Sequence, residues 1–273
     1  MARHQAEFDA HGENTVDDST ASRPKVTVVV PCFNEESGLG PLIERLDAMQ
    51  ATLHDPWQFI FVDDGSTDAT FARLLRAAAL RPWITILRHE ENLGLGAALR
   101  TGFRQARSPI VCTIDSDCTY PPERLVELVE LVQDGADIAT ASAWHPASMR
   151  AQGSWFRIRL SRMVSSFYKA LIGQDVYTFT CLFRAHRREL LDRIRFRSNG
   201  FAAVAELMLR ALLSGATVAE VPMPLASRQY GESKLKIGDA VVAHVGLLTM
   251  TTALVGAQRI RRNYNSTTEK EAA

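Results

Sequence analysis

Two carboxylates stand two positions apart in the middle of the chain. Asp115 and Asp117 flank Ser116 directly after an apolar run that ends at Ile114. Carboxylates at the end of a buried strand are unfavourable without a cation or hydrogen-bond donors. Mg²⁺ or Mn²⁺ supplies that compensation and is commonly shared with phosphate oxygens. The pattern predicts a divalent-metal site for a phosphorylated ligand, with an acidic surface turn as the alternative.

A second acidic stretch also follows an apolar run. The run that ends at Val62 is followed by Asp63 and Asp64 and then by a glycine. A carboxylate here can hydrogen-bond a nucleotide base or ribose, and the glycine permits a tight turn close to a ligand. Helix capping by Ser66 or Asp68 is the alternative, and different residues can serve each role.

Cations that suit phosphate groups occur in the second half of the chain. Arg228 and Lys234 flank a short loop that contains a glycine and a serine, and phosphate groups require such partners. Arg157, Arg159 and Arg162 share one predicted helix. For these three, a solvated helix face is an equally strong interpretation.

Several common sites are not indicated. Two glycines between residues 92 and 97 resemble a dinucleotide fingerprint, but Leu99 replaces its third glycine, so close helix–strand packing is the preferred explanation. Lys plus Arg and Asp plus Glu both total 31, which gives no bulk attraction to nucleic acid. None of the 4 cysteines forms a C-x-x-C pair, which favours a reducing, cytosolic compartment.

The elements that must position these residues alternate between strand and helix. Continuous β-branched runs such as residues 26–30 are typical of strands buried on both faces. Repeated β-α units predict a doubly wound, mostly parallel sheet, whose ligands bind at the carboxyl ends of the strands. The predicted strands cover residues 26–30, 58–62, 84–87, 110–114, 137–141 and 216–221, and the helices 37–50, 68 onward, 93–106, 122–133, 155–172 and 201–213.

The sequence of 273 residues predicts one main domain with a tail at each end. Residues 1–23 are polar and predict a disordered tail. Residues 24–258 form the domain, with one half at 24–141, a second half at 142–235 and an apolar helix at 236–258. Residues 259–273 form a basic and polar tail.

The apolar segment at residues 240–256 falls short of the roughly 20 residues that span a bilayer. Arg259, Arg261 and Arg262 follow it directly. An apolar helix with a basic end suits a membrane surface. A core helix with a solvated tail is the other interpretation, and both stay open.

Five motifs, in order, resemble glycosyltransferase family 2, with the dolichyl- and polyprenyl-phosphate sugar transferases as the nearest branch. They read VVVPCFNEES, VDDGSTD, ENLGLGAALRTG, DSDCTYPPE and RQYGESKL, between residues 26 and 235. The resemblance implies a GT-A fold, with a Rossmann-like nucleotide-sugar-binding half at residues 24–141 and an acceptor half at residues 142–235. It also implies inverting transfer from a nucleotide-sugar to a polyprenyl (dolichyl or undecaprenyl) phosphate, on the cytoplasmic face of a membrane.

The resemblance also assigns residues. Asp115 and Asp117 hold the metal, and Arg228 and Lys234 hold phosphates, so that Asp117, Arg228 and Lys234 carry the catalytic roles. The donor-contacting residues that carry over are Pro31, Phe33 (where the family usually has Tyr), Glu35, Val62, Asp64, Asp115, Ser116 and Asp117.

Three departures concern the acceptor more than the donor. Ala143 stands where the family has a phosphate-binding arginine, and Arg150, Arg157 and Arg159 are the candidates to replace it. Thr119 stands where a glutamine is frequent and is a poorer metal ligand. The family's Thr-Ser-Gly-Phe-Arg reads Thr-Cys-Leu-Phe-Arg at residues 180–184.

The expected mechanism is dominated by charge. A metal with Arg228 and Lys234 would stabilise the departing nucleoside diphosphate. A phosphate acceptor is already an anion and needs no general base, whereas a hydroxyl acceptor needs a carboxylate. Glu206 is expected to serve acceptor positioning or structure. The alternatives are transfer to a soluble or natural-product hydroxyl, and a catalytically weak binding or scaffold protein.

Overall fold

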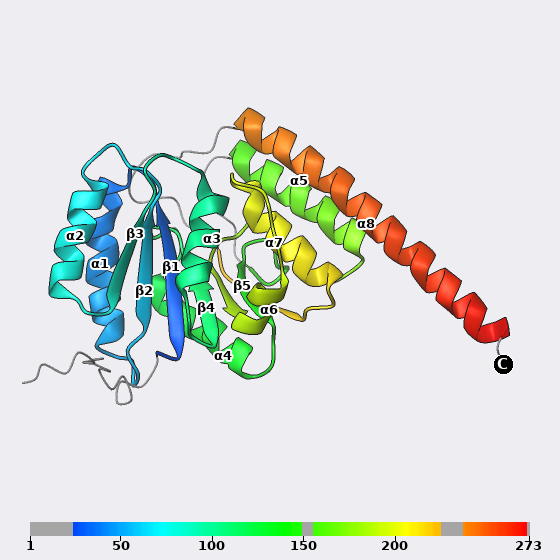
Figure 1. The fold of residues 1–273 in the computed structure, drawn as a ribbon, viewed down its shortest axis with the longest axis horizontal. Helices are drawn as coiled ribbons and strands as arrows, with labels where there is room; N and C mark the ends of the chain where they lie inside the picture. The colour runs from blue at the N-terminus through cyan, green and yellow to red at the C-terminus, as the bar shows by residue number, and fades with distance from the viewer. Residues whose placement is uncertain (1–23, 149–154, 225–236, 272–273) are drawn as a thin grey trace, which may run out of the picture.

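One mixed sheet of seven strands runs through the protein in the order β3-β2-β1-β4-β6-β5-β7 (Figure 1). The computed structural model describes residues 24–148, 155–224 and 237–271. Every neighbouring pair is parallel except the two made by β6. The strands are β1 (Val26–Cys32), β2 (Gln58–Asp63), β3 (Ile84–Arg88), β4 (Ile110–Thr113), β5 (Ile138–Ser142), β6 (Arg184–Arg187) and β7 (Val218–Pro222).

Helices cover both faces of this sheet and enclose two hydrophobic cores. Neighbouring residues of β1 belong to different cores, with Val28 and Val30 in one and Val29 in the other, because successive side chains of a strand point to opposite faces. One face carries α1 (Glu36–Gln50), α2 (Thr70–Leu80), the 3-10 turn η1 (Pro122–Arg124) and α4 (Leu125–Gln133). The other carries α3 (Leu95–Gln105), α5 (Trp155–Ile172), α6 (Arg188–Arg193), α7 (Ala202–Leu213) and α8 (Ile237–Glu271).

The sequence did not indicate β6 or α6. The β6 residues read Arg-Ala-His-Arg, yet Arg184 and His186 are each only 1% exposed. Arg184 donates to the carbonyls of Val204 (2.8 Å) and Phe179 (2.7 Å), and His186 Nδ1 lies 3.1 Å from the carbonyl of Val111. These main-chain partners offset much of the cost of burying the polar strand, and no local pattern reveals them. His186 Nε2 is buried without a hydrogen-bond partner among the described residues.

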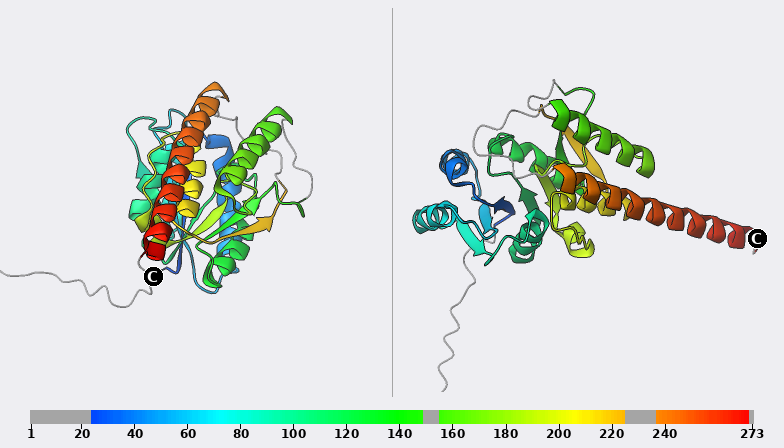
Figure 2. Two further views of the ribbon diagram at one scale, coloured as in Figure 1. Left: turned by 90° about the vertical axis from the view of Figure 1, so that its right-hand side faces the viewer. Right: turned by 90° about the horizontal axis from the view of Figure 1, so that it is seen from above.

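Helix α8 is longer than the predicted apolar helix, because it continues through the predicted tail to Glu271. Figure 2 shows its last turns extending away from the body of the protein. Leu247 and Thr251 are buried against the core, and His244 Nδ1 lies 2.9 Å from the Tyr168 hydroxyl of α5. Among the described residues, no helix is both long and apolar enough to cross a membrane.

The glycines near the start of α3 serve close packing, as expected, but against a loop rather than a strand. A Cβ on Gly94, whose φ is +93°, would lie 2.5 Å from the Asn199 carbonyl oxygen, and one on Gly96 would lie 2.0 Å from that of Ser198. Arg100 reinforces this contact by donating to the Ser198 carbonyl at 2.9 Å. Helix α3 is thereby joined to the segment that leads into α7.

Candidate active site

The acidic motifs meet at one edge of the sheet. Strands β2, β1 and β4 are adjacent and parallel, so the segments that follow them emerge side by side (Figure 1). These segments contain Glu35, Asp64 and the Asp115 to Asp117 turn. The predicted position at the carboxyl ends of the strands is therefore the position that the structure has.

The segments after β1 and β2 are locked together by reciprocal hydrogen bonds. Asn34, in a left-handed conformation with φ of 52°, accepts from the Thr67 backbone N–H at 2.8 Å and donates its own to Ser66 Oγ at 3.0 Å. The backbone N–H of Glu35 donates to Thr70 Oγ1 at 2.8 Å. Of the predicted donor-contacting residues, Pro31 lies near the end of β1, and Phe33 and Glu35 lie on the braced turn that follows; Pro31 and Phe33 are half-buried and Glu35 is buried.

Asp64 has a structural role that the sequence did not indicate. Its carboxylate accepts from the backbone N–H groups of Leu93 (3.0 Å) and Gly94 (2.8 Å), and His89 Nδ1 lies 2.6 Å away. His89 Nε2 lies 3.0 Å from Thr101 Oγ1. Asp64 thus ties the end of β2 to the start of α3, next to the fully buried Val62.

The Asp115 to Asp117 turn follows β4 and is held in one conformation. Asp115 is half-buried, whereas Ser116 and Asp117 are buried. Thr119 donates to Asp117 Oδ1 through both its backbone N–H (2.9 Å) and its hydroxyl (2.6 Å). Cys118 between them has a φ of 55°, which this tight turn requires.

The donor set of this turn fits a hard divalent cation. Two carboxylates with the remaining positions left to phosphate and water are the usual protein contribution to a Mg²⁺ site. No third His, Cys, Asp or Glu joins them in the part of the chain that the structure describes. Burial raises the pKa of the Cys118 thiol, with Arg45 opposing.

The structure describes only some of the basic side chains that were predicted to bind phosphate. Arg159 is exposed on α5. Arg228, Lys234 and Arg150 lie outside the described residues, as does the side chain of Arg157. The positions of these four groups relative to Asp117 therefore stay predictions.

Ala143 is buried at the end of β5, where the family has an arginine. A polar network supports its neighbours: Ser142 Oγ lies 2.9 Å from Thr178 Oγ1, and Glu220 of β7 accepts from the Thr178 backbone N–H at 3.0 Å. Thr178 Oγ1 also accepts from the Trp144 backbone N–H at 3.3 Å. The sequence carried no signal for this network, because its members come from three separate segments.

Glu206 has a structural role. Its carboxylate accepts from the backbone N–H groups of Arg197 (3.1 Å) and Ser198 (2.8 Å) and from Arg210 Nε (2.7 Å). Burial works to raise the pKa of Glu206, but hydrogen bonds led by Ser198 outweigh it and lower the pKa. Of the two roles expected from the sequence, the contacts support the structural one, because they fix the segment that Gly96 contacts.

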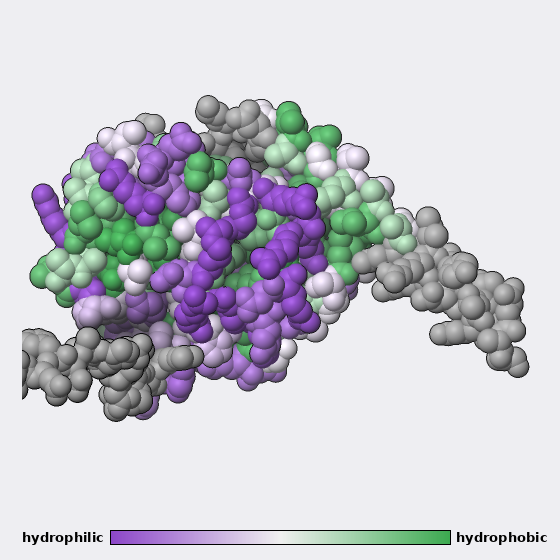
Figure 3. All heavy atoms as spheres, viewed as in Figure 1, coloured by the Kyte–Doolittle hydropathy of each residue, from purple (hydrophilic) through white to green (hydrophobic). Residues whose placement is uncertain are grey.

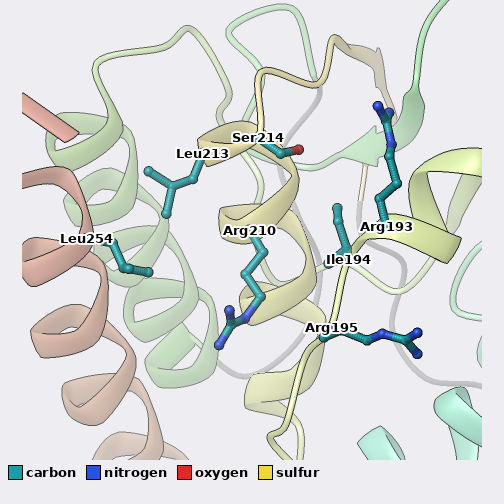
Figure 4. A pocket seen from close by; sticks show the side chains of 7 residues that line it. All are labelled: Arg193, Ile194, Arg195, Arg210, Leu213, Ser214 and Leu254. Carbon is teal, nitrogen blue, oxygen red and sulfur yellow. The ribbon is translucent and has the colours of Figure 1, made fainter. Parts of the chain in front are cut away.

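A separate pocket of about 340 Å³ lies at the carboxyl end of α7, away from this edge of the sheet (Figure 4). Three of its lining residues are arginines, but their guanidinium groups point in different directions. They do not converge on one anion. The pocket is lined by Arg193, Ile194, Arg195, Arg210, Leu213, Ser214 and Leu254.

Comparison with known sequences identifies related proteins. The model of glycosyl transferase family 2 matches residues 27–195. An undecaprenyl-phosphate 4-deoxy-4-formamido-L-arabinose transferase of Serratia proteamaculans is 31% identical over 235 residues, which cover 84% of this chain and 68% of that protein. A polyprenol monophosphomannose synthase of Mycolicibacterium smegmatis is 31% identical over 229 residues, which cover 80% of this chain and 84% of that protein.

Comparison with solved structures concerns the fold. Glucosyl-3-phosphoglycerate synthase from Mycobacterium tuberculosis, in complex with Mn²⁺, UDP and glucosyl-3-phosphoglycerate, matches with a TM-score of 0.64 and 19% identity, over 86% of this chain and 81% of that chain. The same protein with Mg²⁺ and UDP matches with the same TM-score of 0.64 and 19% identity, over 86% and 80%. These likenesses confirm the predicted GT-A architecture.

Proposed function

The chain belongs to glycosyl transferase family 2, and on that premise we propose that it transfers a sugar from a nucleotide-sugar to a polyprenyl phosphate with inversion at the sugar. The observation that carries the proposal is the position of Asp115 and Asp117 at the end of β4, beside the braced turns after β1 and β2. Two carboxylates suited to a divalent cation and two hydrogen-bonded turns occur together there.

The donor half of the reaction uses this edge. The segments at the ends of β1 and β2, which contain Pro31, Phe33, Glu35, Val62 and Asp64, would receive the nucleoside. Asp115 and Asp117 would hold Mg²⁺ or Mn²⁺ against the diphosphate, and Thr119 keeps Asp117 oriented.

The bound cation would neutralise charge on the departing diphosphate. Arg228 and Lys234 would add fixed positive charge around the same group.

The acceptor proposal rests on the relatives' names together with the chemistry. Both relatives cited above are named for undecaprenyl-phosphate or polyprenol substrates. A phosphate monoester is anionic near neutral pH, so the site needs to position it and does not need to remove a proton. Glu206 is the carboxylate that was considered for the acceptor half. Its hydrogen bonds to Arg210 and to the backbone of residues 197 and 198 agree with a reaction that needs no general base.

A polyprenyl acceptor keeps its hydrocarbon tail in the membrane, and an exposed apolar face next to the acceptor half supports peripheral binding at the cytoplasmic surface. Met163 and Phe167 on α5, and Val241 and Val245 on α8, form two i,i+4 pairs with at least 40% exposure. Val242 on α8 is 73% exposed.

The two helices lie side by side through the Tyr168–His244 contact, and apolar atoms follow the outer edge of α8 in Figure 3. The membrane-facing surface proposed from residues 240–256 is thus revised. Part of that segment packs inward through Leu247 and Thr251, and α5 supplies the rest of the apolar face.

The proposal is tested by reconstituting transfer. Nucleotide-sugars are first screened by thermal shift with and without Mn²⁺. The stabilising donor is then incubated with undecaprenyl phosphate in detergent, and nucleoside diphosphate release and the lipid-linked product are both measured.

We expect metal-dependent formation of a lipid-phosphate sugar. Diphosphate release only with a soluble hydroxyl acceptor would instead support transfer to a soluble or natural product. No donor-dependent release with any acceptor would support a binding or scaffold protein.

A further inference from the structure

The indole of Trp144 carries a hydrogen-bond donor that the described residues do not satisfy. Its Nε1 atom is buried and has no acceptor within the described part of the chain. An indole N–H can only donate, and when buried it usually finds a partner. A buried donor without an acceptor is unfavourable, so its retention requires an explanation.

The backbone from which this indole extends is fixed. The Trp144 backbone N–H donates to Thr178 Oγ1 at 3.3 Å. Thr178 is itself held by Ser142, at 2.9 Å between hydroxyls, and by Glu220, at 3.0 Å from the Thr178 backbone nitrogen. The backbone of Trp144 therefore belongs to a junction of β5, β7 and the segment before β6, held by hydrogen bonds.

The order of the strands places this junction on the acceptor side of the site. From the nucleoside side the sheet runs β2, β1, β4, β6, β5. Asp115 and Asp117 follow β4, and Trp144 follows β5, two strand positions further along the same edge. Two strand spacings amount to about 10 Å, roughly the reach of a hexose and the phosphate that attacks it.

We propose that the Trp144 indole N–H donates a hydrogen bond to a phosphate oxygen of the acceptor and so positions it for attack on the sugar. The inference rests on the proposed function. An N–H···O bond to an anionic phosphate oxygen is charge-assisted and directional, and the site supplies it from a residue that needs no counter-ion. Trp144 thereby helps to position the acceptor phosphate, a role that the short side chain of Ala143 cannot perform.

The test removes the indole N–H and keeps the size and shape of the ring system. Benzothienylalanine, in which sulfur stands where the indole has N–H, is incorporated at Trp144. The same replacement at Trp83, which packs on Phe59 at a centroid distance of 5.2 Å, is the matched control. Trp144→Phe provides a second variant. Donor and acceptor KM, kcat and the melting temperature are measured for each.

We expect the acceptor KM to rise about tenfold in the Trp144 variants, with the donor KM and the melting temperature unchanged. The Trp83 control should match the wild type. An unchanged acceptor KM in a wild type that does glycosylate polyprenyl phosphate would overturn this inference alone. A rise in the donor KM instead would also overturn it. A wild type that makes no lipid-linked product would overturn the proposed function itself.

Discussion

Asp117 and Thr119 form a closed pair, in which one oxygen of the Asp117 carboxylate accepts both the Thr119 backbone N–H at 2.9 Å and its hydroxyl at 2.6 Å. The sequence marked Thr119 as a poor metal ligand. The structure gives it a different task, because a ligand carboxylate held by two donors keeps a fixed orientation. Thr119 would therefore act on a bound metal through Asp117.

Thr119→Val should remove the hydroxyl bond and keep the backbone bond. We expect the Mn²⁺ concentration for half-maximal activity to rise about tenfold to a hundredfold, since outer partners of metal ligands have effects of that size. Metal titrations of activity and of donor binding measure this. Thr119→Ser keeps the hydroxyl and should resemble the wild type. Equal metal dependence in the valine and serine variants would mean that the hydroxyl does not matter.

Asp117→Asn should reduce turnover by more than about a hundredfold and abolish metal-dependent nucleotide binding, because the change removes a charged ligand. The asparagine side-chain oxygen can still accept from Thr119, so the melting temperature should stay within about 4 °C of the wild type. Calorimetric titration of donor with and without Mn²⁺ is the measurement. Equal donor affinity with and without Mn²⁺ in the wild type would exclude the metal site.

Arg228→Ala and Lys234→Ala should each lower kcat by about a hundredfold while leaving stability nearly unchanged, since each removes a fixed charge from the departing diphosphate. Steady-state kinetics and thermal melts distinguish the two effects. Lys25→Ala is the control, because Lys25 at the amino end of β1 is 67% exposed and pairs only with Asp55 at 2.6 Å among the described residues. Wild-type rates in both loop variants would place the loop outside the site.

The apolar face of α5 and α8 should bind anionic vesicles. Replacing both Phe167 and Val242 with serine removes two exposed apolar groups, and we expect vesicle binding to fall at least about tenfold in co-sedimentation. Leu80→Ser is the control, since Leu80 is 79% exposed on α2, away from this face.

High salt should weaken vesicle binding of the wild type, because the basic residues after position 258 contribute about 1 kcal/mol each near anionic lipid. A wild type that fails to sediment with vesicles at low salt would favour a core helix and a soluble acceptor. Binding that survives both salt and carbonate would indicate deeper insertion.

His186 should make the protein less stable in acid. Burial, with the nearby Arg184 charge adding to it, lowers the pKa of His186 from 6.5 to about 3. Below about pH 6.5 the unfolded imidazole binds a proton that the folded one does not. The free energy of unfolding should therefore fall as the pH drops from 6.5 toward 3, by up to about 1.4 kcal/mol per pH unit.

His186→Asn retains a donor for the Val111 carbonyl and removes the titrating ring. Urea unfolding at pH 7.5 and pH 5 should show a smaller loss of stability for this variant than for the wild type. An equal loss in both proteins would assign the acid sensitivity to other groups.

Local patterns were enough to predict most of the elements. The helix from Trp155 to Ile172 has its predicted ends, and the parallel strands lie within about 2 residues of their predicted positions. Apolar runs and helical periodicity are properties of consecutive residues, so tertiary contacts were not needed to recognise them. The same logic located Asp115 and Asp117 at a strand end.

Contacts between distant segments were not predictable in this way. The polar strand β6 is buried because Arg184 and His186 find carbonyl partners on other elements. Asp64 is committed to His89 and to the start of α3, and Glu206 to the turn that precedes its own helix. The free energy of burying a polar group depends on its partners, and partners separated by many residues leave no periodic trace.

The sequence by itself determined the family, the parallel sheet and the acidic edge where a nucleotide-sugar and a metal would meet, because each depends on short runs of residues in a known order. The tertiary structure alone decided that Thr119 orients Asp117, that α5 lies beside α8, and that the indole N–H of Trp144 is buried with no acceptor among the described residues. Those facts arise where separate segments pack together, and only packing determines which polar groups are satisfied and which remain available to a substrate.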